Sequence, residues 1–440
     1  MNYSDSERIA SVLEEIGCKK SPNPEMADLI LINMCSVRQS AVDRIFGKIE
    51  NLSKLKNQGS KAKIILTGCI LKSDIKKFKN KVDLILNIKD LPKLPKILNS
   101  KRAEKNKRNY LEIKPRYQNP FSAFVPIMTG CNNFCSYCAV PYTKGKEISR
   151  PAKEIIDEIK DLVEKGTNPI RNEISNGARE IWLLGQNVNS YKDGQITFSK
   201  LLRKVNSIKG NFWIRFTSPH PKPSTRAELG AGPVPHRNKV SGAGDFSWDE
   251  LIDTMATCKK VTPYLNLPVQ SGDDEILKKM NRPYTILHYK NLVKKIRKKI
   301  PDIALSTDII VGFPGETKKQ FENTVKLFKE IKYDMAYISK YSPRIGTIAS
   351  KLKDNVSLEE KEKRRKILTE VLKKTALEKN KRYVGKKVDV LIDNKKNRFY
   401  FGKTRSYKTV KINSGKNLIG LFSKVKIINA LPWGLEGKLK

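Results

Sequence analysis

The sequence predicts a multidomain α/β protein: an N-terminal parallel α/β layer, a run of about six β/α units, and a small C-terminal β-barrel. Apolar runs of strand length alternate with segments of helical periodicity through most of the chain, which is the pattern of parallel β/α folds. After residue 383 the pattern changes to about five short strand-like runs without helices between them, as in small barrels. A chain of 440 residues is long enough for about three such domains.

The N-terminal layer is expected to begin with a helix, because residues 4–7 form a capping-box pattern and apolar residues follow at helical spacing. Cys35 and Cys69 each come directly after a predicted strand, and the carboxyl ends of parallel strands share one edge of a sheet. We therefore expect both thiols at that edge. The predicted strands of this layer are 29–34, 64–67 and 82–86, with helices up to about residue 57 and over 71–79.

A linker and then the β/α units follow. Residues 87–118 contain several prolines and a run rich in Lys, Arg and Asn, which predicts a linker. Six units are too few for a closed eight-unit barrel. The predicted strands of these units are 124–128, 181–184, 213–217, 264–269, 303–311 and 335–341.

Three cysteines after the first of these strands form the most specific motif. Cys131, Cys135 and Cys138 have the spacing C-x3-C-x2-C. Thiols this close can bind a 4Fe–4S cluster through three irons and leave the fourth iron open to another ligand. They cannot all pair as disulfides, and no His or further Cys follows within the next dozen residues to complete a zinc site. Buried free thiols are the remaining alternative.

Charge and cysteine content indicate the partners and the compartment. The chain has 87 Lys and Arg against 45 Asp and Glu, a net charge of +42, which favours a polyanion such as nucleic acid. A lysine-rich surface without a partner is the alternative. Seven cysteines suit a reducing cytoplasm and metal binding better than a disulfide framework. No apolar run approaches the roughly 20 residues of a membrane span, so no membrane partner is expected.

The cysteine motif, together with residues 140–145 and 149–151, resembles the radical S-adenosylmethionine enzymes, and more narrowly the methylthiotransferases. The resemblance implies a partial (β/α)6 barrel and a 4Fe–4S cluster on Cys131, Cys135 and Cys138, where S-adenosylmethionine would bind the open iron and be cleaved to a radical. Residues 180–191 look like the members that act on tRNA, and 215–220, 267–272 and 307–316 match too. Glycines and short polar side chains at strand ends suit a cofactor pocket, although such turns alone are more often only turns. The implied S-adenosylmethionine pocket comprises Gln186, Asn187, Gln270, Ser271 and Asp308.

Residues 33–38 and 67–69 resemble two of the three cysteine turns that hold an auxiliary 4Fe–4S cluster in methylthiotransferases. Cys35 and Cys69 are therefore the implied ligands of a second cluster. Met1 matches the family two residues after its first cysteine, so we expect that cysteine and its strand to be encoded upstream; a genuine two-cysteine site is the alternative. Cys18 does not match the missing turn.

The C-terminal segment resembles the TRAM RNA-binding domain. Aromatic residues and cations alternate there, and the combination suits stacking on bases and binding of phosphates. The alternative is a barrel core that alternates with solvated charge. The residues concerned are Phe399, Tyr400, Phe401, Lys403, Arg405, Tyr407 and Lys408.

The resemblance covers nearly the whole chain and implies three domains, at 1–98, 117–373 and 376–440. It implies methylthiolation of carbon 2 of N6-dimethylallyladenosine beside the anticodon, with a tRNA anticodon stem-loop as substrate, flavodoxin or ferredoxin as electron donor, and a monomer. The alternatives are a threonylcarbamoyladenosine methylthiotransferase and a non-catalytic RNA-binding protein. Residues 167–178 and 223–244 depart from the family and are expected to be surface loops, so His236 is not a ligand candidate.

Overall fold

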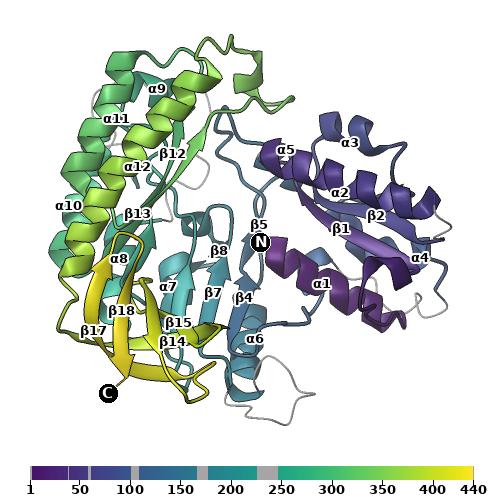
Figure 1. Ribbon diagram of the computed structural model, residues 1–440, viewed down its shortest axis with the longest axis horizontal. Helices are drawn as coiled ribbons and strands as arrows, with labels where there is room; N and C mark the ends of the chain where they lie inside the picture. The colour runs from purple at the N-terminus through teal and green to yellow at the C-terminus, as the bar shows by residue number, and fades with distance from the viewer. Residues whose placement is uncertain are drawn as a thin grey trace. The chain divides into compact units, whose positions relative to one another are not determined.

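The computed structural model describes residues 2–37, 39–57, 61–100, 109–165, 177–224 and 246–439. It forms two compact units (Figure 1). The first comprises Met1–Asn119, Phe124–Arg150 and Ser342–Leu352; the second comprises Pro120–Ala123, Pro151–Tyr341 and Lys353–Lys440. Most of the two predicted surface loops, with His236, lies outside the described residues. Within the described ranges, no helix combines the length and the apolar character needed to cross a bilayer.

A three-stranded parallel sheet forms the centre of the first unit, in the order β1-β2-β3. One apolar cluster includes Ile9 and Val12 of α1, and a second includes Val42 and Ile49 of α2. The predicted parallel α/β layer is therefore confirmed, with a core on both faces of its sheet. The elements are α1 (Asn2–Glu15), η1 (Pro24–Met26), β1 (Leu29–Cys35), α2 (Gln39–Asn57), β2 (Lys63–Cys69), α3 (Lys72–Phe78), β3 (Leu84–Ile85), β5 (Met128–Thr129), α5 (Val140–Lys144), β6 (Ile148–Ser149) and η7 (Ile348–Lys351).

The linker predicted at 87–118 is wrong for most of its described part. This segment forms η2 (Ile88–Lys93), α4 (Leu94–Ile97) and η4 (Tyr110–Glu112). Leu91 and Leu94 are completely buried in the same cluster as α1. Pro95 fits because it lies in the first turn of α4, where the N–H groups are unpaired in any case, whereas Pro92 lies inside η2. Residues 101–108 of the predicted linker lie outside the described residues.

The second unit contains the β/α units. Its strands form two sheets, β10-β7-β4 and β11-β12-β13, and a parallel bridge between Ile214 and Val261 connects β10 to the segment before β11. This succession of six strands is the predicted partial barrel. The strands are β4 (Ser122–Pro126), β7 (Glu180–Leu184), β10 (Trp213–Phe216), β11 (Tyr264–Asn266), β12 (Ala304–Val311) and β13 (Met335–Lys340); η5 (Val188–Ser190), β8 (Lys192–Asp193) and β9 (Ile196–Thr197) lie between β7 and β10.

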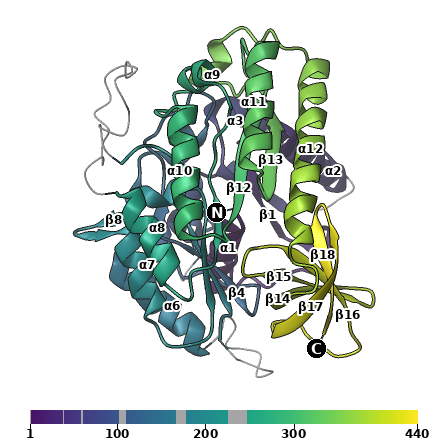
Figure 2. The ribbon, with the colours of Figure 1, turned by 90° about the vertical axis from the view of Figure 1, so that its left-hand side faces the viewer.

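Helices cover the outer face of these strands. Figure 2 shows α10, α11 and α12 side by side in the second unit. Their apolar residues alternate with cations at helical spacing, so each helix buries one face against the strands. The helices are α6 (Ala152–Lys165), α7 (Phe198–Asn206), α8 (Trp248–Thr257), α9 (Asp274–Lys279), α10 (Ile286–Lys299), α11 (Lys318–Ile331) and α12 (Leu358–Lys381).

The C-terminal segment is a closed five-stranded barrel in the order β14-β15-β16-β18-β17, which confirms the prediction. Val390, Ile392, Tyr400, Val410 and Ile412 are buried in its core. Closure leaves no strand edge unpaired, so a domain this small can be stable. The strands are β14 (Lys387–Lys396), β15 (Phe399–Thr404), β16 (Thr409–Asn413), β17 (Phe422–Leu431) and β18 (Gly434–Leu439).

Candidate active site

The three-cysteine loop lies in the first unit, between β5 and α5. Gly130 begins it with a φ of +82°, and a Cβ there would lie 1.9 Å from the Lys146 carbonyl oxygen, so only glycine fits. The backbone N–H of Cys131 donates to the Gly145 carbonyl (3.0 Å), and that of Cys138 donates to the Cys135 carbonyl (2.9 Å). The loop is therefore folded back on itself, with all three cysteines in one turn of chain.

The thiols of this loop differ in exposure. Cys131 is 8% exposed, and Cys135 and Cys138 are half-buried. Burial raises the pKa of Cys131 to about 11, and the neighbouring Cys135 also raises it, against hydrogen bonds from Asn133. Among the described residues, no three Cys, His, Asp or Glu side chains are already gathered around one point. Three thiols in one turn are nevertheless the donor set that an iron–sulfur cluster uses. The positive charge of the bound iron would favour loss of the thiol protons and so stabilise the thiolates.

Cys35 and Cys69 are the last residues of β1 and β2, and they are partners in the parallel register. The structure therefore places both thiols at one edge of the sheet, as the strand pattern predicts. Cys69 is buried and Cys35 is half-buried. The backbone N–H of Ser36 donates to the Cys69 carbonyl (2.8 Å), so the two strand ends are held together beyond the ladder.

A buried charged group lies beside Cys69 in the same unit. Lys144, the last residue of α5, is 3% exposed; its Nζ donates to Asp5 Oδ2 (3.1 Å), and its charge also acts on the Cys69 thiol. Asp5 also accepts a hydrogen bond from the Tyr110 hydroxyl. Burial raises the pKa of Cys69 to about 11, and the Lys144 ammonium acts in the opposite direction. Lys144 thus connects the helix that follows Cys138 to the strand end that carries Cys69.

No local sequence pattern points to this buried pair. Lys144 lies in the family-like segment 140–145 and Asp5 in the capping box, but the two residues are 139 positions apart. Neither helical nor strand periodicity predicts a pairing over such a distance.

We expect Lys144→Met to destabilise the first unit by about 3–5 kcal/mol, because it leaves the fully buried Asp5 without its paired ammonium. Urea unfolding of the cluster-free protein measures the change. Lys93→Met is the matched control, since the ammonium of Lys93 pairs with Asp90 at an exposed site and its loss should leave the transition unchanged. Equal midpoints for both variants would show that the buried pair contributes nothing.

The predicted pocket residues lie in the second unit, at two separate places. Gln186 and Asn187 follow β7, whereas Gln270 and Ser271 follow β11. The backbone N–H of Gln270 donates to the Asp308 carbonyl (2.9 Å), so these two residues are brought together. Asp308 itself lies within β12 and not at its carboxyl end. Gln270 has a φ of +71°, which is strained for a residue other than glycine and is typical of functional sites.

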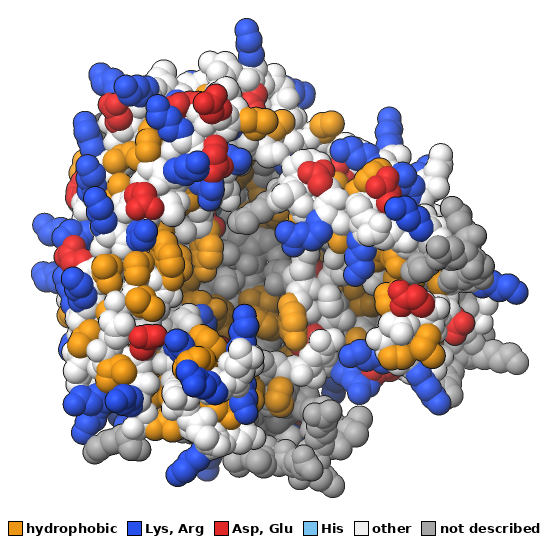
Figure 3. Space-filling model, viewed as in Figure 1, with side chains coloured by type: hydrophobic (Ala, Val, Ile, Leu, Met, Phe, Trp, Pro, Cys, Tyr) orange, Lys and Arg blue, Asp and Glu red, His pale blue; other side chains and the backbone are white. Residues whose placement is uncertain are grey.

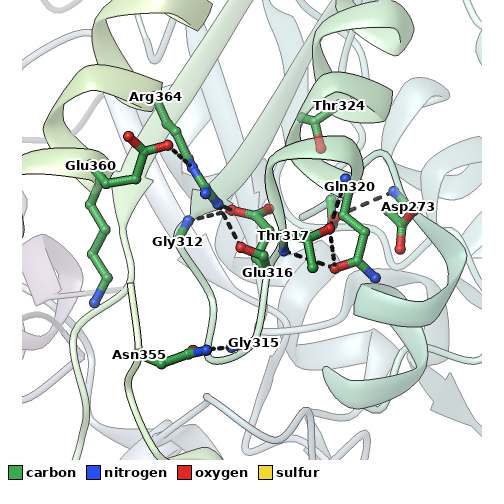
Figure 4. A network of polar contacts seen from close by, with 12 residues as sticks. Asp273, Gly312, Gly315, Glu316, Thr317, Gln320, Thr324, Asn355, Glu360 and Arg364 are labelled. Carbon is green, nitrogen blue, oxygen red and sulfur yellow. Dashed lines mark hydrogen bonds and ion pairs between the residues drawn. The ribbon is translucent and has the colours of Figure 1, made fainter. Parts of the chain in front are cut away.

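The turn after β12, residues 312–316, is braced from within the protein (Figure 4). The Glu316 carboxylate is buried and accepts from the Gly312 N–H (2.6 Å) and from Arg364 Nη1 (2.7 Å). Asn355 Oδ1 accepts from the Gly315 N–H (2.8 Å). Burial raises the pKa of Glu316, and the Arg364 and Gly312 hydrogen bonds act in the opposite direction. The Glu316 side chain therefore anchors this turn to α12. The backbone N–H groups of Gly312 and Gly315 hold the turn in its conformation.

Three comparisons with known proteins agree with this geometry. Residues 125–328 match the Radical SAM superfamily, residues 1–87 the uncharacterized protein family UPF0004, and residues 381–440 the TRAM domain. The chain is 40% identical over 461 aligned residues to the tRNA-2-methylthio-N(6)-dimethylallyladenosine synthase of Clostridium botulinum (strain Langeland), covering 100% of this chain and 94% of the relative. The chain belongs to this synthase family. The synthases of Carboxydothermus hydrogenoformans (40% identical; 100% and 97% covered) and Thermoanaerobacter sp. (39%; 100% and 90%) give the same result.

Solved structures share the fold of this family member. The apo structure of the cobalamin-dependent S-adenosylmethionine radical enzyme OxsB aligns with a TM-score of 0.50 and 12% identity. The alignment covers 82% of this chain and 53% of that chain, so this chain matches about half of that protein's length. The structural similarity supports the radical S-adenosylmethionine fold, and an identity this low supports no conclusion about the reaction.

The TRAM barrel of this synthase relative is attached to the β/α units through Arg215 of β10. Arg215 is 1% exposed and donates through Nε to Glu180 Oε1 (2.5 Å). Its Nη atoms donate to the carbonyls of Thr404 (2.9 Å) and Arg405 (2.8 Å), and its guanidinium lies 4.9 Å from the centre of the Tyr407 ring. One buried cation therefore holds the whole turn between β15 and β16.

Several of the aromatic and cationic residues predicted to bind RNA between Phe399 and Lys408 have partners within the protein. Tyr400 is buried in the barrel core, and Tyr407 packs against Trp182 and Tyr264 (ring centres 5.1 and 4.8 Å apart). Arg405 donates to the Lys259 carbonyl (2.6 Å), and Lys408 pairs with Asp334 (2.7 Å). The prediction is wrong for Tyr400, which is enclosed in the barrel core. The turn that carries the other three residues packs on the neighbouring domain, so these residues do not form an open stacking surface.

Phe399 fits the original expectation better. Its half-buried ring has Lys411 Nζ 4.2 Å and the Arg398 guanidinium 5.1 Å from its centre. An aromatic face flanked by cations suits a stacked base and its phosphate.

Figure 3 shows Lys and Arg side chains spread over the visible faces of both units.

Proposed function

We propose that this protein is a tRNA methylthiotransferase that adds a methylthio group to carbon 2 of N6-dimethylallyladenosine beside the anticodon. The observation that carries the proposal is 40% identity over the entire chain to synthases of that name, in a protein that retains the C-x3-C-x2-C loop. The TRAM domain and the net charge of +42 support tRNA as the substrate. The free cysteines support a reducing compartment, the cytoplasm.

Cys131, Cys135 and Cys138 are the proposed ligands of a 4Fe–4S cluster whose open iron binds S-adenosylmethionine. When bound, this cluster supplies the electron that cleaves S-adenosylmethionine. The loop's part is to present three thiols and leave the fourth position open, which three ligands in one turn achieve. Cys35 and Cys69 are the proposed ligands to a second, auxiliary cluster. Their adjacent register and the positive charge of Lys144 acting on Cys69 support this assignment.

Gln186, Asn187, Gln270, Ser271 and Asp308 are the proposed S-adenosylmethionine pocket. The strained backbone at Gln270 and the burial of Asn187 and Ser271 beyond two strand ends support it. The proposed domains are residues 1–98, 117–373 and 376–440, acting as a monomer on a tRNA anticodon stem-loop with flavodoxin or ferredoxin as electron donor.

Two matched RNA substrates test the proposal. Anaerobically reconstituted protein is incubated with S-adenosylmethionine, a reductant and an anticodon stem-loop that carries either N6-dimethylallyladenosine or threonylcarbamoyladenosine. We expect the methylthio nucleoside from the first RNA only, as measured by mass spectrometry of digested RNA. Product from the threonylcarbamoyl RNA alone would overturn the assigned substrate, and product from neither RNA would contradict the proposed activity.

A further inference from the structure

We propose that a cavity between the TRAM barrel and the β/α units binds one unstacked nucleotide of single-stranded RNA. The inference rests on the proposed action on tRNA and assigns a contact point remote in sequence from Cys35, Cys69 and the three-cysteine loop. The cavity has a volume of about 180 Å³ and lies wholly within the second unit. It is lined by the first residues of β11, β12 and β13 and by the barrel turns at 406–409 and 432–434.

Aromatic side chains form much of the cavity wall. Tyr264 and Tyr407 are packed against each other, whereas Tyr337 and Trp433 are 44% and 46% exposed. The other three tryptophans of the chain are at most 7% exposed. A base can stack on an exposed aromatic face whatever its identity, because every base has a π-face. Trp433 and Tyr337 are therefore the residues that a nucleobase would meet first.

The charge around the cavity is positive in excess. Asp334 pairs with Lys408 (2.7 Å) and with Lys379 (3.4 Å). The charge of Arg297 also acts on Asp334 and Lys379. Two cations therefore pair with one buried carboxylate, and Lys403 also lines the cavity. A phosphate group would compensate this excess, which favours an anionic ligand over a neutral one.

A hydrogen-bond acceptor completes the site. Asn380 lines the cavity and is 2% exposed. Its Nδ2 donates to the Leu431 carbonyl (2.7 Å), while its Oδ1 has no hydrogen-bond partner among the described residues. An amide oxygen can accept from an exocyclic amine or from a ribose hydroxyl. Aromatic faces, excess cations and this acceptor together match one nucleotide, and the volume is too small for a helical duplex.

Trp433 makes the proposal directly measurable. Because the other tryptophans are buried, the part of the RNA-induced emission change that is lost in Trp433→Ala reports on Trp433. We expect an anticodon stem-loop to quench this emission, and Trp433→Ala to weaken stem-loop binding by roughly 5- to 150-fold, the range for losing one stacked base. Trp433→Phe, which keeps a stacking ring, should restore most of the affinity. Ile428→Ala, at a residue 45% exposed on β17, is the matched control and should bind as the unchanged protein does.

The outcomes separate this inference from the proposed function. Unchanged affinity in Trp433→Ala and no quenching, in a protein that still methylthiolates the stem-loop, would overturn the nucleotide site alone. Quenching by adenosine monophosphate without any effect of Trp433→Ala on stem-loop affinity would likewise overturn it, because the cavity would then take a free nucleotide. The same variant should cleave S-adenosylmethionine normally without RNA, which excludes general damage, and failure of the unchanged protein to bind the stem-loop would overturn both proposals.

Discussion

Cys131→Ala, Cys135→Ala and Cys138→Ala should each reduce S-adenosylmethionine cleavage to background. Each residue is one of only three proposed protein ligands of the cluster, so no other thiol of the loop can replace it. The measurement is 5′-deoxyadenosine formation by anaerobically reconstituted protein with a chemical reductant. This is the largest effect that we expect from any single substitution in the chain.

Cys18→Ala and Cys258→Ala are the matched controls. Both cysteines are free thiols, as are the other five, but neither belongs to a cysteine motif. They should leave cleavage intact, and iron content should fall only in the loop variants. Continued 5′-deoxyadenosine formation by Cys135→Ala protein would remove the basis for assigning the cluster to this loop.

Arg215→Met should destabilise the second unit by about 3–5 kcal/mol, because it leaves the buried Glu180 carboxylate without its cation and removes the donors to the Thr404 and Arg405 carbonyls. We also expect the TRAM barrel to be released more readily by limited proteolysis. Chemical unfolding and the rate of cleavage near residue 384 measure the two effects.

Arg203→Met is the control for this substitution. Arg203 pairs with Asp253 at a distance of 3.1 Å, but both side chains are more than 40% exposed. Exposed pairs contribute little, so the transition should not move. Equal stability of the two variants would contradict the view that Arg215 attaches the barrel. Deleting residues 384–440 is a poorer test, because it would expose Trp213, which packs against Phe422 and Leu391 of the barrel.

Secondary structure is predicted well from the sequence where a segment has a single hydrophobic period, either helical or strand-like. The three strands of the first unit's parallel sheet, the six of the partial barrel and the five of the C-terminal barrel follow from apolar runs and turn residues. The edge shared by Cys35 and Cys69 follows from topology, because parallel strands present their carboxyl ends on one side. The linker failed for the opposite reason. Its prolines and cations suggest an exposed segment, but Leu91 and Leu94 are buried against residues of α1 that are distant in sequence.

The site shows the same division between local pattern and distant contact. The cysteine loop could be identified because its three cysteines lie within eight consecutive positions. The role of residues 399–408 could not be identified in this way. Alternation of apolar and polar residues separates the two faces of a strand, but it does not indicate which face packs against another domain. Tyr407, Arg405 and Lys408 have the composition of an RNA-binding surface, yet their partners are Trp182, the Lys259 carbonyl and Asp334.

The central claim is that one protein couples cleavage of S-adenosylmethionine to methylthiolation of tRNA. The most direct measurement incubates the reconstituted protein with methyl-labelled S-adenosylmethionine and the dimethylallyladenosine stem-loop, and determines both products by mass spectrometry. We predict labelled methylthio nucleoside and 5′-deoxyadenosine rising together in the unchanged protein, and neither product in Cys135→Ala. 5′-Deoxyadenosine that forms at the same rate with and without RNA, and without any methylthio nucleoside, would contradict the claim.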